Sequence, residues 1–138
     1  MPTIHSKTQE VHHSSQHIFN FLTDFNNFKA LLPADRIEHW QCTADSCSFT
    51  IVGMAALKLN ISEKISFSKV SYVSDPTAKY KFNLTVNISD TDPQQCNCTI
   101  EMSYDLNPLL NPFAEKPLTG LINMMVTKLA DPELKIAL

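Results

Sequence analysis

The sequence predicts an α+β fold in which a curved antiparallel sheet of about seven strands wraps around a long C-terminal helix. Two observations carry this prediction: several segments alternate apolar and polar residues, and a long apolar helical stripe follows the last of them. Successive strand side chains point to opposite faces, so each alternating segment has one buried face and one face in water. An antiparallel sheet of this kind has an apolar face that another element must cover.

The strands are predicted from this alternation and from the turns between the alternating segments. They are expected at residues 3–11, 36–42, 47–52, 57–61, 67–74, 80–88 and 96–106. The last two segments alternate without a fault, whereas the first is weakly patterned. Proline and short polar residues at 74–77 and 89–93 are typical of loops.

Two short helices are predicted after the first strand. Ser14 or Ser15 is a suitable N-cap, and apolar residues from Ile18 onward recur at helical spacing. Residues 24–28 divide this stretch into two helices, and Pro33 ends the second.

The last predicted element is a long helix near the C-terminus. Asn107-Pro108 and Asn111-Pro112 both resemble a cap followed by proline at the first helical position, so two starting points stay open. Asp131-Pro132 ends the helix. Its apolar stripe consists of Leu110, Phe113, Pro117, Leu118, Leu121, Met125 and Leu129. We expect this helix to lie across the concave side of the sheet, because it is the largest element available to cover it.

The composition indicates a single globular domain spanning residues 1–138. Hydrophobic residues make up 43% and charged residues 18%, which is typical of a folded chain. A net charge of -3 without a basic cluster argues against a nucleic-acid partner. No signal peptide is recognisable, and no apolar run approaches the roughly 20 residues that span a bilayer. We therefore expect a cytoplasmic protein without membrane insertion, whose cysteines stay reduced.

No set of residues predicts a catalytic, metal or cofactor site. Only two glycines occur, which excludes glycine-rich phosphate loops. The four cysteines fall in two pairs, Cys42 with Cys47 and Cys96 with Cys98, without the C-x-x-C spacing usual for zinc. Cys42 and Cys47 flank a predicted hairpin, which permits a cross-strand contact, and all four are interpreted as small core residues. The five histidines form no catalytic trio and are expected at the surface.

Two stretches of the sequence carry a family resemblance. Val11 is followed by residues 14–28, which hold a helix with an apolar pair, Asp and Asn, and then by Leu31-Leu32-Pro33. Asn107-Pro108-Leu109-Leu110 and Lys116-Pro117-Leu118 lead into the last helix. These stretches resemble the opening and the closing helix of the START-like superfamily, also called SRPBCC or helix-grip. It includes polyketide cyclases, lipid-transfer domains, birch-pollen-allergen proteins and coenzyme-Q-binding proteins. The resemblance implies a cavity between sheet and helix that accepts an apolar small molecule.

The residues expected to line this cavity follow from the alternation and the helical stripe. They are Phe49, Ile51, Leu59, Tyr80, Phe82, Leu84, Ile100, Met102 and Tyr104 on the sheet, and Leu118, Gly120, Leu121, Ile122 and Met125 on the helix. The same side chains would alternatively fill the interior completely, and this interpretation stays open. Gly120 either leaves room for a ligand or allows close packing of helix on sheet, and packing is favoured.

Three functions remain open from the sequence. The first is a binding module that holds a hydrophobic small molecule or lipid, without metal or cofactor. The second is a polyketide-cyclase or aromatase-type enzyme that uses a tyrosine or histidine as acid or base. The third is a protein-interaction domain like the co-chaperone branch of this fold. The sequence identifies neither the ligand nor the oligomeric state.

Overall fold

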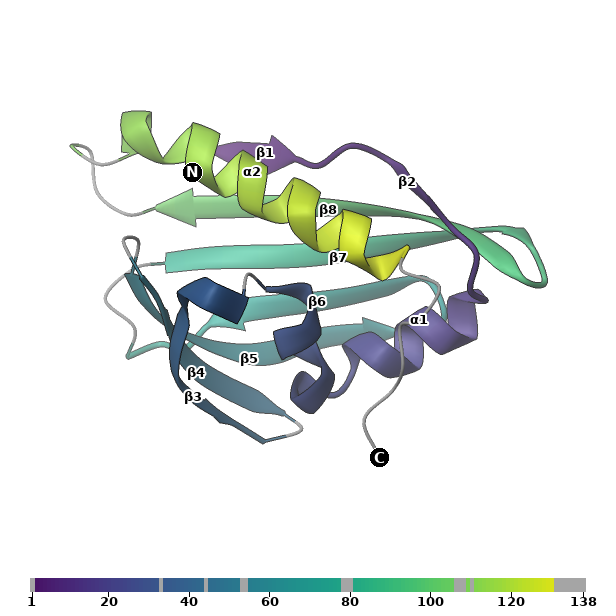
Figure 1. Cartoon of the computed structure of the whole chain (residues 1–138), viewed down its shortest axis with the longest axis horizontal. Helices are drawn as coiled ribbons and strands as arrows, with labels where there is room; N and C mark the ends of the chain where they lie inside the picture. The colour runs from purple at the N-terminus through teal and green to yellow at the C-terminus, as the bar shows by residue number, and fades with distance from the viewer. Residues whose placement is uncertain are drawn as a thin grey trace.

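A computed structural model describes residues 2–32, 34–43, 45–52, 55–77, 81–105, 109 and 111–130, without the side chains of Ala34, Ile51 and Ala55. It contains one antiparallel sheet with helices on one face (Figure 1). The elements are β1 (Thr3–His5), β2 (Gln9–Val11), α1 (Ser15–Leu22), the 3-10 helices η1 (Phe25–Leu31) and η2 (Ala34–Arg36), β3 (Ile37–Cys42), β4 (Ser46–Ile51), β5 (Ala55–Ile65), β6 (Lys69–Ser74), β7 (Lys81–Asp92), β8 (Gln95–Asp105) and α2 (Asn111–Leu129). The predicted fold class is confirmed.

The sheet has eight strands in the order β1-β8-β7-β6-β5-β4-β3, and β2 also pairs with β8. The count exceeds the predicted seven because the segment 3–11 forms two short strands, β1 and β2, on the same neighbour. Ser6 lies at the break between them. Its Oγ accepts a hydrogen bond from the Ile100 N–H at 2.8 Å, and its own N–H donates to the Ile100 carbonyl at 2.8 Å. The interruption therefore leaves the backbone of β8 satisfied.

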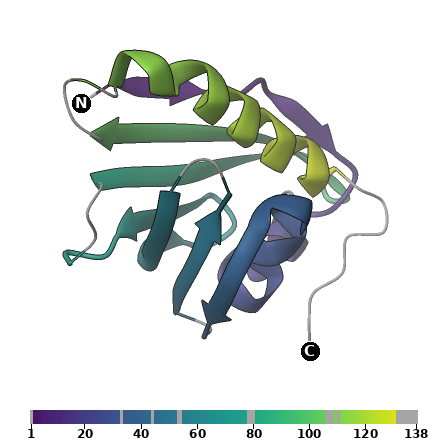
Figure 2. The same cartoon turned by 60° about the vertical axis from the view of Figure 1, so that its left-hand side comes forward.

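Helices α1, η1 and α2 lie on the concave face of the sheet (Figures 1 and 2). Helix α2 packs on β8 and reaches β1, β2 and η1, whereas α1 packs on β6 and β7. The expected position of the C-terminal helix on the concave face is confirmed, and the two preceding helices share that face with it. A single helix is too narrow for a sheet this wide, so α1 and η1 cover the part that α2 leaves open.

Side-chain caps fix where the first two helices begin. Ser14 is the N-cap of α1, because its Oγ accepts from the His17 N–H at 3.1 Å. Asp24 caps η1 by accepting from the Asn26 N–H at 2.9 Å. Two short helices are thus confirmed, the second of them a 3-10 helix. Of the predicted helix-ending prolines, Pro33 and Pro132 lie outside the described residues, as does the alternative start at Asn107-Pro108.

The buried face of α2 differs from the predicted stripe. Its buried residues are Ala114, Leu118, Ile122, Met125, Val126 and Leu129. Phe113 is 78% exposed, and Pro117 is exposed as well. Leu118, Met125 and Leu129 of the predicted stripe are buried as expected, whereas at the start of the helix Ala114 is buried in place of Phe113 and Pro117. Small Ala114 meets the sheet near the helix start, where bulky Phe113 was expected.

An aromatic cluster ties the first helices to the sheet. Tyr72 of β6 packs against Phe25 and Phe28 of η1, with ring centroids 5.2 and 5.3 Å away. The Tyr72 hydroxyl donates a hydrogen bond of 2.6 Å to the Leu22 carbonyl at the end of α1. Burial raises the pKa of Tyr72 well above its usual range, so the hydroxyl stays a donor. This end of the interior is closely packed.

Candidate functional site

A small apolar cavity lies where η1, the sheet and α2 meet. Its volume is about 30 Å³, roughly the share of liquid volume that one water molecule takes. The side chains that line it are Phe28 and Leu32 from η1 and its C-cap, Phe49 from β4, Leu57 and Leu59 from β5, Phe82 and Leu84 from β7, Met102 from β8, and Leu121, Ile122 and Met125 from α2. Every one of them is apolar.

Strand pairing brings the sheet residues of the cavity together. Leu84 pairs directly with Met102 across β7 and β8, and Phe49 pairs with Leu57 across β4 and β5. Paired residues share a face, so each pair points toward the helices. Leu57 and Leu121 are partly exposed, whereas the other lining residues are buried. These two form the rim through which the cavity meets solvent.

Many of the residues expected to line a cavity lie around this one. They are Phe49, Leu59, Phe82, Leu84, Met102, Leu121, Ile122 and Met125. Ile100, Tyr104 and Leu118 face the same interior but are packed away from the cavity. Tyr80 and the Ile51 side chain lie outside the described residues.

Gly120 has neither of the two roles considered from the sequence, which were to leave room for a ligand or to allow close packing of helix on sheet. It is exposed on α2, and an ideal Cβ built there meets nothing within 4 Å. Gly120 therefore neither borders the cavity nor allows a close approach of helix and sheet. Gly120 lies on the side of α2 opposite the buried residues.

Three lining residues were not anticipated: Phe28, Leu32 and Leu57. Leu57 shares the alternation of Leu59 and was detectable from the sequence. Phe28 and Leu32 contribute because η1 packs against α2. That contact joins segments about 90 residues apart in the chain, and no local pattern indicates it.

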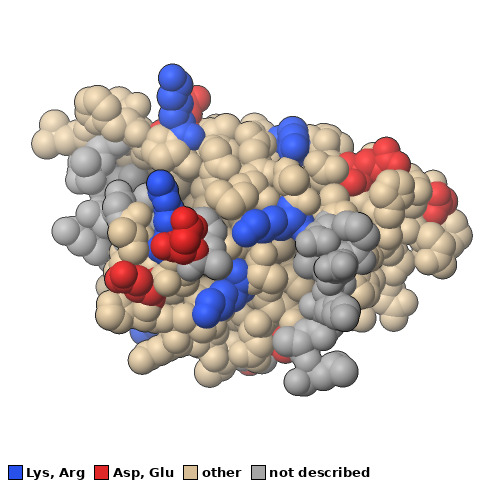
Figure 3. Space-filling view, viewed as in Figure 1, with Lys and Arg blue, Asp and Glu red and all other residues tan. Residues whose placement is uncertain are grey.

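The cavity offers no group for acid–base chemistry. Among the described residues, no ionisable or hydrogen-bonding side chain lines it. The hydroxyl of the buried Tyr72 donates its hydrogen bond to the Leu22 carbonyl. The charged side chains lie on the surface. Figure 3 shows basic side chains scattered around α2 and an acidic group toward the β7–β8 turn, where Asp90 and Asp92 are exposed. The side chains described around the cavity are apolar, and such a lining favours contact with an apolar group over a polar one.

The wall of the cavity on the β3–β4 side is aromatic. Phe49 stacks on Trp40 of β3 with ring centroids 5.2 Å apart, and the Lys29 Nζ lies 5.9 Å from the Trp40 ring centroid. Trp40 thus packs behind Phe49, which lines the cavity. The quadrupole of the indole ring attracts a cation at this distance.

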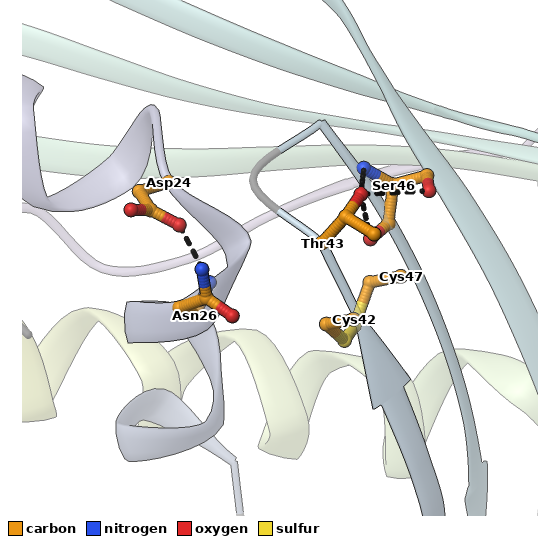
Figure 4. The surroundings of a disulfide bond; sticks show 6 residues. All are labelled: Asp24, Asn26, Cys42, Thr43, Ser46 and Cys47. Carbon is orange, nitrogen blue, oxygen red and sulfur yellow. Dashed lines mark hydrogen bonds between the residues drawn. A yellow bond between two sulfur atoms is a disulfide. The ribbon is translucent and has the colours of Figure 1, made fainter.

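The same hairpin carries a disulfide between Cys42 and Cys47 (Figure 4). The two residues are direct partners across β3 and β4, with Cα atoms 4.1 Å apart. Beyond them, Thr43 and Ser46 close the turn through the Thr43 N–H, which donates to the Ser46 carbonyl at 2.8 Å. The expectation that all four cysteines are reduced core residues is therefore wrong for this pair. Their positions on either side of the turn place the sulfur atoms in contact.

The other two cysteines fit the prediction of small core residues. Cys96 and Cys98 are fully buried, with Sγ atoms 3.9 Å apart. The hydrogen bond to Cys96 and burial raise the pKa of Cys98, so its sulfur stays a thiol. No group of three or more His, Cys, Asp or Glu in the described part of the chain is placed to hold a metal ion.

The histidines lie at or near the surface, as expected. The side chains of His12 and His39 are 66% and 79% exposed, and His5 is exposed. His13 and His17 are partly buried, and their rings stack with centroids 4.8 Å apart. This stack crosses the start of α1, a contact that the sequence reading missed. The spacing of four residues was the available signal.

Two larger hollows lie on the surface. One, of about 360 Å³, is lined by Ser14, Ser15, Gln16, Phe67, Asp90, Asp92 and Pro93. The other, of about 310 Å³, is lined by Ser62, Glu63, Lys69, Ser71, Tyr72, Val73, Asn83 and Thr85. Both are open to solvent and are lined largely by polar residues. The smaller apolar cavity is the better candidate, because its lining gains most from an apolar guest.

Comparison with solved structures identifies the fold. Neither a family model nor a curated protein sequence matches the chain. A START superfamily protein from Mycobacterium smegmatis superposes with a TM-score of 0.74 over 93% of this chain and 94% of that chain, at 12% identity. The chain has the START-like fold. Norcoclaurine synthase from Thalictrum flavum, solved with dopamine and hydroxybenzaldehyde, gives a TM-score of 0.68 at 16% identity, over 94% of this chain and 84% of that chain.

Another START-like neighbour is the di-domain ARO/CYC protein BexL. Its TM-score is 0.68 at 6% identity, over 94% of this chain and 45% of BexL. The resemblance found in the sequence is thus confirmed at the level of the fold. At such identities the likeness carries over no residue role. None of the described helices is long and apolar enough to cross a membrane.

Proposed function

We propose that this START-like domain binds a hydrophobic small molecule or lipid in the cavity between η1, the sheet and α2. The observation that carries the proposal is the lining: eleven side chains from several elements converge on one cavity, and all are apolar. A ligand pocket usually adds a few polar groups to such a lining. Among the described residues no polar side chain lines the cavity, which favours a ligand whose buried part is hydrocarbon.

The cavity must enlarge when the ligand enters. Its volume of about 30 Å³ is far below the roughly 300–1,000 Å³ of typical ligand sites. Met102 and Met125 supply flexible side chains that repack readily. Leu57 and Leu121, at the rim, are partly exposed and free to rotate outward. Binding is therefore expected to displace side chains rather than to fill an open space.

The first test is native mass spectrometry of the protein purified from its own host. Denaturing extraction then identifies any bound molecule. A reproducible apolar molecule that leaves on denaturation supports the proposal and names the ligand class. A mass that always equals the bare chain counts against it.

A second test uses a matched pair of substitutions on α2. Leu121→Trp fills the cavity rim, whereas Met124→Trp changes a partly exposed neighbour that does not line the cavity. Titration with the neutral fluorophore 1-aminoanthracene reports on apolar binding. We expect Leu121→Trp to weaken binding about tenfold, equivalent to about 1.4 kcal/mol, and Met124→Trp to leave it nearly unchanged. Equal effects of the two substitutions would place the fluorophore elsewhere.

A further inference from the structure

The Cys42–Cys47 disulfide joins the edge strand of the sheet to the strand that carries one wall of the cavity (Figure 4). Strand β3 is the last in the strand order, so within the described part of the chain it pairs with β4 alone. That pairing is interrupted between Glu38 and Gln41, where His39 has a φ of 56°. A strand paired on one side, with an interrupted ladder, is held by few backbone hydrogen bonds. The disulfide is therefore a covalent link at a place where the backbone pairing is incomplete.

Both ends of this link are connected to the cavity wall. On β4, Cys47 pairs directly with Leu59 of β5, and Phe49 follows two residues later on the same face. Leu59 and Phe49 both line the cavity. On β3, Trp40 lies two residues before Cys42, and its ring stacks on Phe49. The disulfide thus ties the strand that carries Trp40 to the strand that carries Phe49.

The small cavity makes this link important for binding. Its volume of about 30 Å³ means that the surrounding walls have to move before a ligand enters. Phe49 has no room to move toward β3 while Trp40 is packed behind it. We propose that the Cys42–Cys47 disulfide is a redox switch of the ligand cavity. The oxidised form holds Trp40 against Phe49 and keeps the cavity small, whereas the reduced form lets this wall move and admits the apolar ligand. This regulation rests on the proposed function.

The reductant is a dithiol that exchanges with the disulfide. Cys42 is partly exposed, whereas Cys47 is only 2% exposed, so Cys42 is the accessible partner. A thiolate of the dithiol attacks the Cys42 Sγ, the bond to Cys47 breaks, and Cys47 leaves as a thiolate that takes a proton from water. The second thiolate of the reductant then attacks its own sulfur in the mixed disulfide and releases Cys42, which is protonated in turn. The two cysteines gain two electrons, and the dithiol is oxidised to a disulfide.

The second cysteine pair does not share this property. Cys96 and Cys98 are fully buried, and they lie two residues apart on one strand, β8. At the rise of a strand their Cα atoms are about 6.7 Å apart, close to the upper limit of about 6.8 Å for a disulfide. Their Sγ atoms are 3.9 Å apart and both cysteines are free. We therefore expect the redox response to be confined to the β3–β4 hairpin.

The test is titration of the full chain with 1-aminoanthracene, once after air oxidation and once after reduction by dithiothreitol. We expect the reduced chain to bind about fivefold more tightly, because a larger fraction of its molecules is able to open the cavity. The variant with both Cys42→Ser and Cys47→Ser should bind like the reduced chain, with or without dithiothreitol. This control separates the hairpin from Cys96 and Cys98. Alkylation of the denatured chain followed by mass spectrometry should label two cysteines before reduction and all four after it.

Three results would overturn the redox switch. The oxidised and reduced chains bind the fluorophore equally, the air-oxidised chain exposes four reactive thiols, or dithiothreitol reduces the disulfide only after urea has unfolded the chain. The last result would make the disulfide a purely structural link. Leu121→Trp separates these failures from failure of the ligand site, because it should weaken binding in both redox states. If it does so while the two states bind equally, only the switch is overturned. If neither state binds, or Leu121→Trp has no effect, the ligand site is overturned as well.

Discussion

The two halves of α2 are held in the molecule very differently. In the C-terminal half, Ile122, Met125, Val126 and Leu129 are all at most 2% exposed. In the N-terminal half only Ala114 and Leu118 are buried, each at 7%. The N-terminal half also contains Pro117, which has no N–H to donate to the preceding turn, and the exposed Gly120.

From this difference in burial we expect the N-terminal half of α2 to move more easily than the C-terminal half. The C-terminal half anchors the helix over the packed end of the core. The cavity borders the junction between the halves, at Leu121, Ile122 and Met125. We therefore expect enlargement of the cavity to combine movement of the weakly held half with repacking of the flexible Met125 side chain. The following predictions, in order of expected size, test this division.

The largest loss of unfolding free energy is expected when a buried side chain is shortened in the C-terminal half of α2. Leu129→Ala removes a fully buried side chain and should cost about 3 kcal/mol of unfolding free energy. Leu121→Ala removes a partly exposed side chain at the cavity rim and should cost about 1 kcal/mol. Urea unfolding of both variants measures the difference. Equal losses would mean that the junction is as well packed as the anchor, which contradicts the comparison.

The second prediction concerns the disulfide in the hairpin that carries Trp40 and Phe49. Reduction of Cys42–Cys47, or replacement of both by Ser, opens a loop with a sequence separation of 5. Loop-closure entropy predicts a loss of about 2 kcal/mol. Because Trp40 lies on this hairpin and stacks on Phe49, its fluorescence should change on reduction. The double Ser variant, which should show no such change with reductant, is the control. An unaltered unfolding midpoint on reduction would argue against a stabilising disulfide.

The third prediction concerns the aromatic cluster around Tyr72, away from the cavity. Tyr72→Phe keeps the ring contacts with Phe25 and Phe28 but leaves the Leu22 carbonyl without its hydroxyl donor. We expect a loss of about 1.5 kcal/mol in urea unfolding, with 1-aminoanthracene binding unchanged. A clear change in fluorophore affinity would show that the two ends of the interior are coupled.

The sequence predicted the sheet well because its signal is local. Alternation alone assigns Leu84 and Met102 to the inner face, and their pairing follows from adjacent strands. The parts that it missed depend on tertiary contacts. Phe28 enters the cavity only because η1 meets α2. The start of α2 was misjudged at Phe113, because the sheet beneath the helix decides which of its apolar residues are buried.

The cysteine pair was missed for a different reason. The positions of Cys42 and Cys47 on either side of a turn did indicate a cross-strand contact, and the expected reducing compartment overrode that indication. Geometry was the better guide, because residues that face each other across two strands are in contact whatever the compartment.

The smallest effect, and one of opposite sign, is expected in the weakly held half of α2. Gly120→Ala adds a Cβ that meets nothing within 4 Å and removes the backbone freedom of glycine in a helix. The variant should gain about 1 kcal/mol of unfolding free energy. Thr119→Ala, at the neighbouring position, should gain less, about 0.5 kcal/mol, because threonine already restricts the backbone. If movement of this half admits the ligand, Gly120→Ala should also slow the association of 1-aminoanthracene in stopped-flow mixing, and Thr119→Ala should not. A stabilised Gly120→Ala variant with unchanged association would place ligand entry elsewhere, at the Leu57 side of the rim.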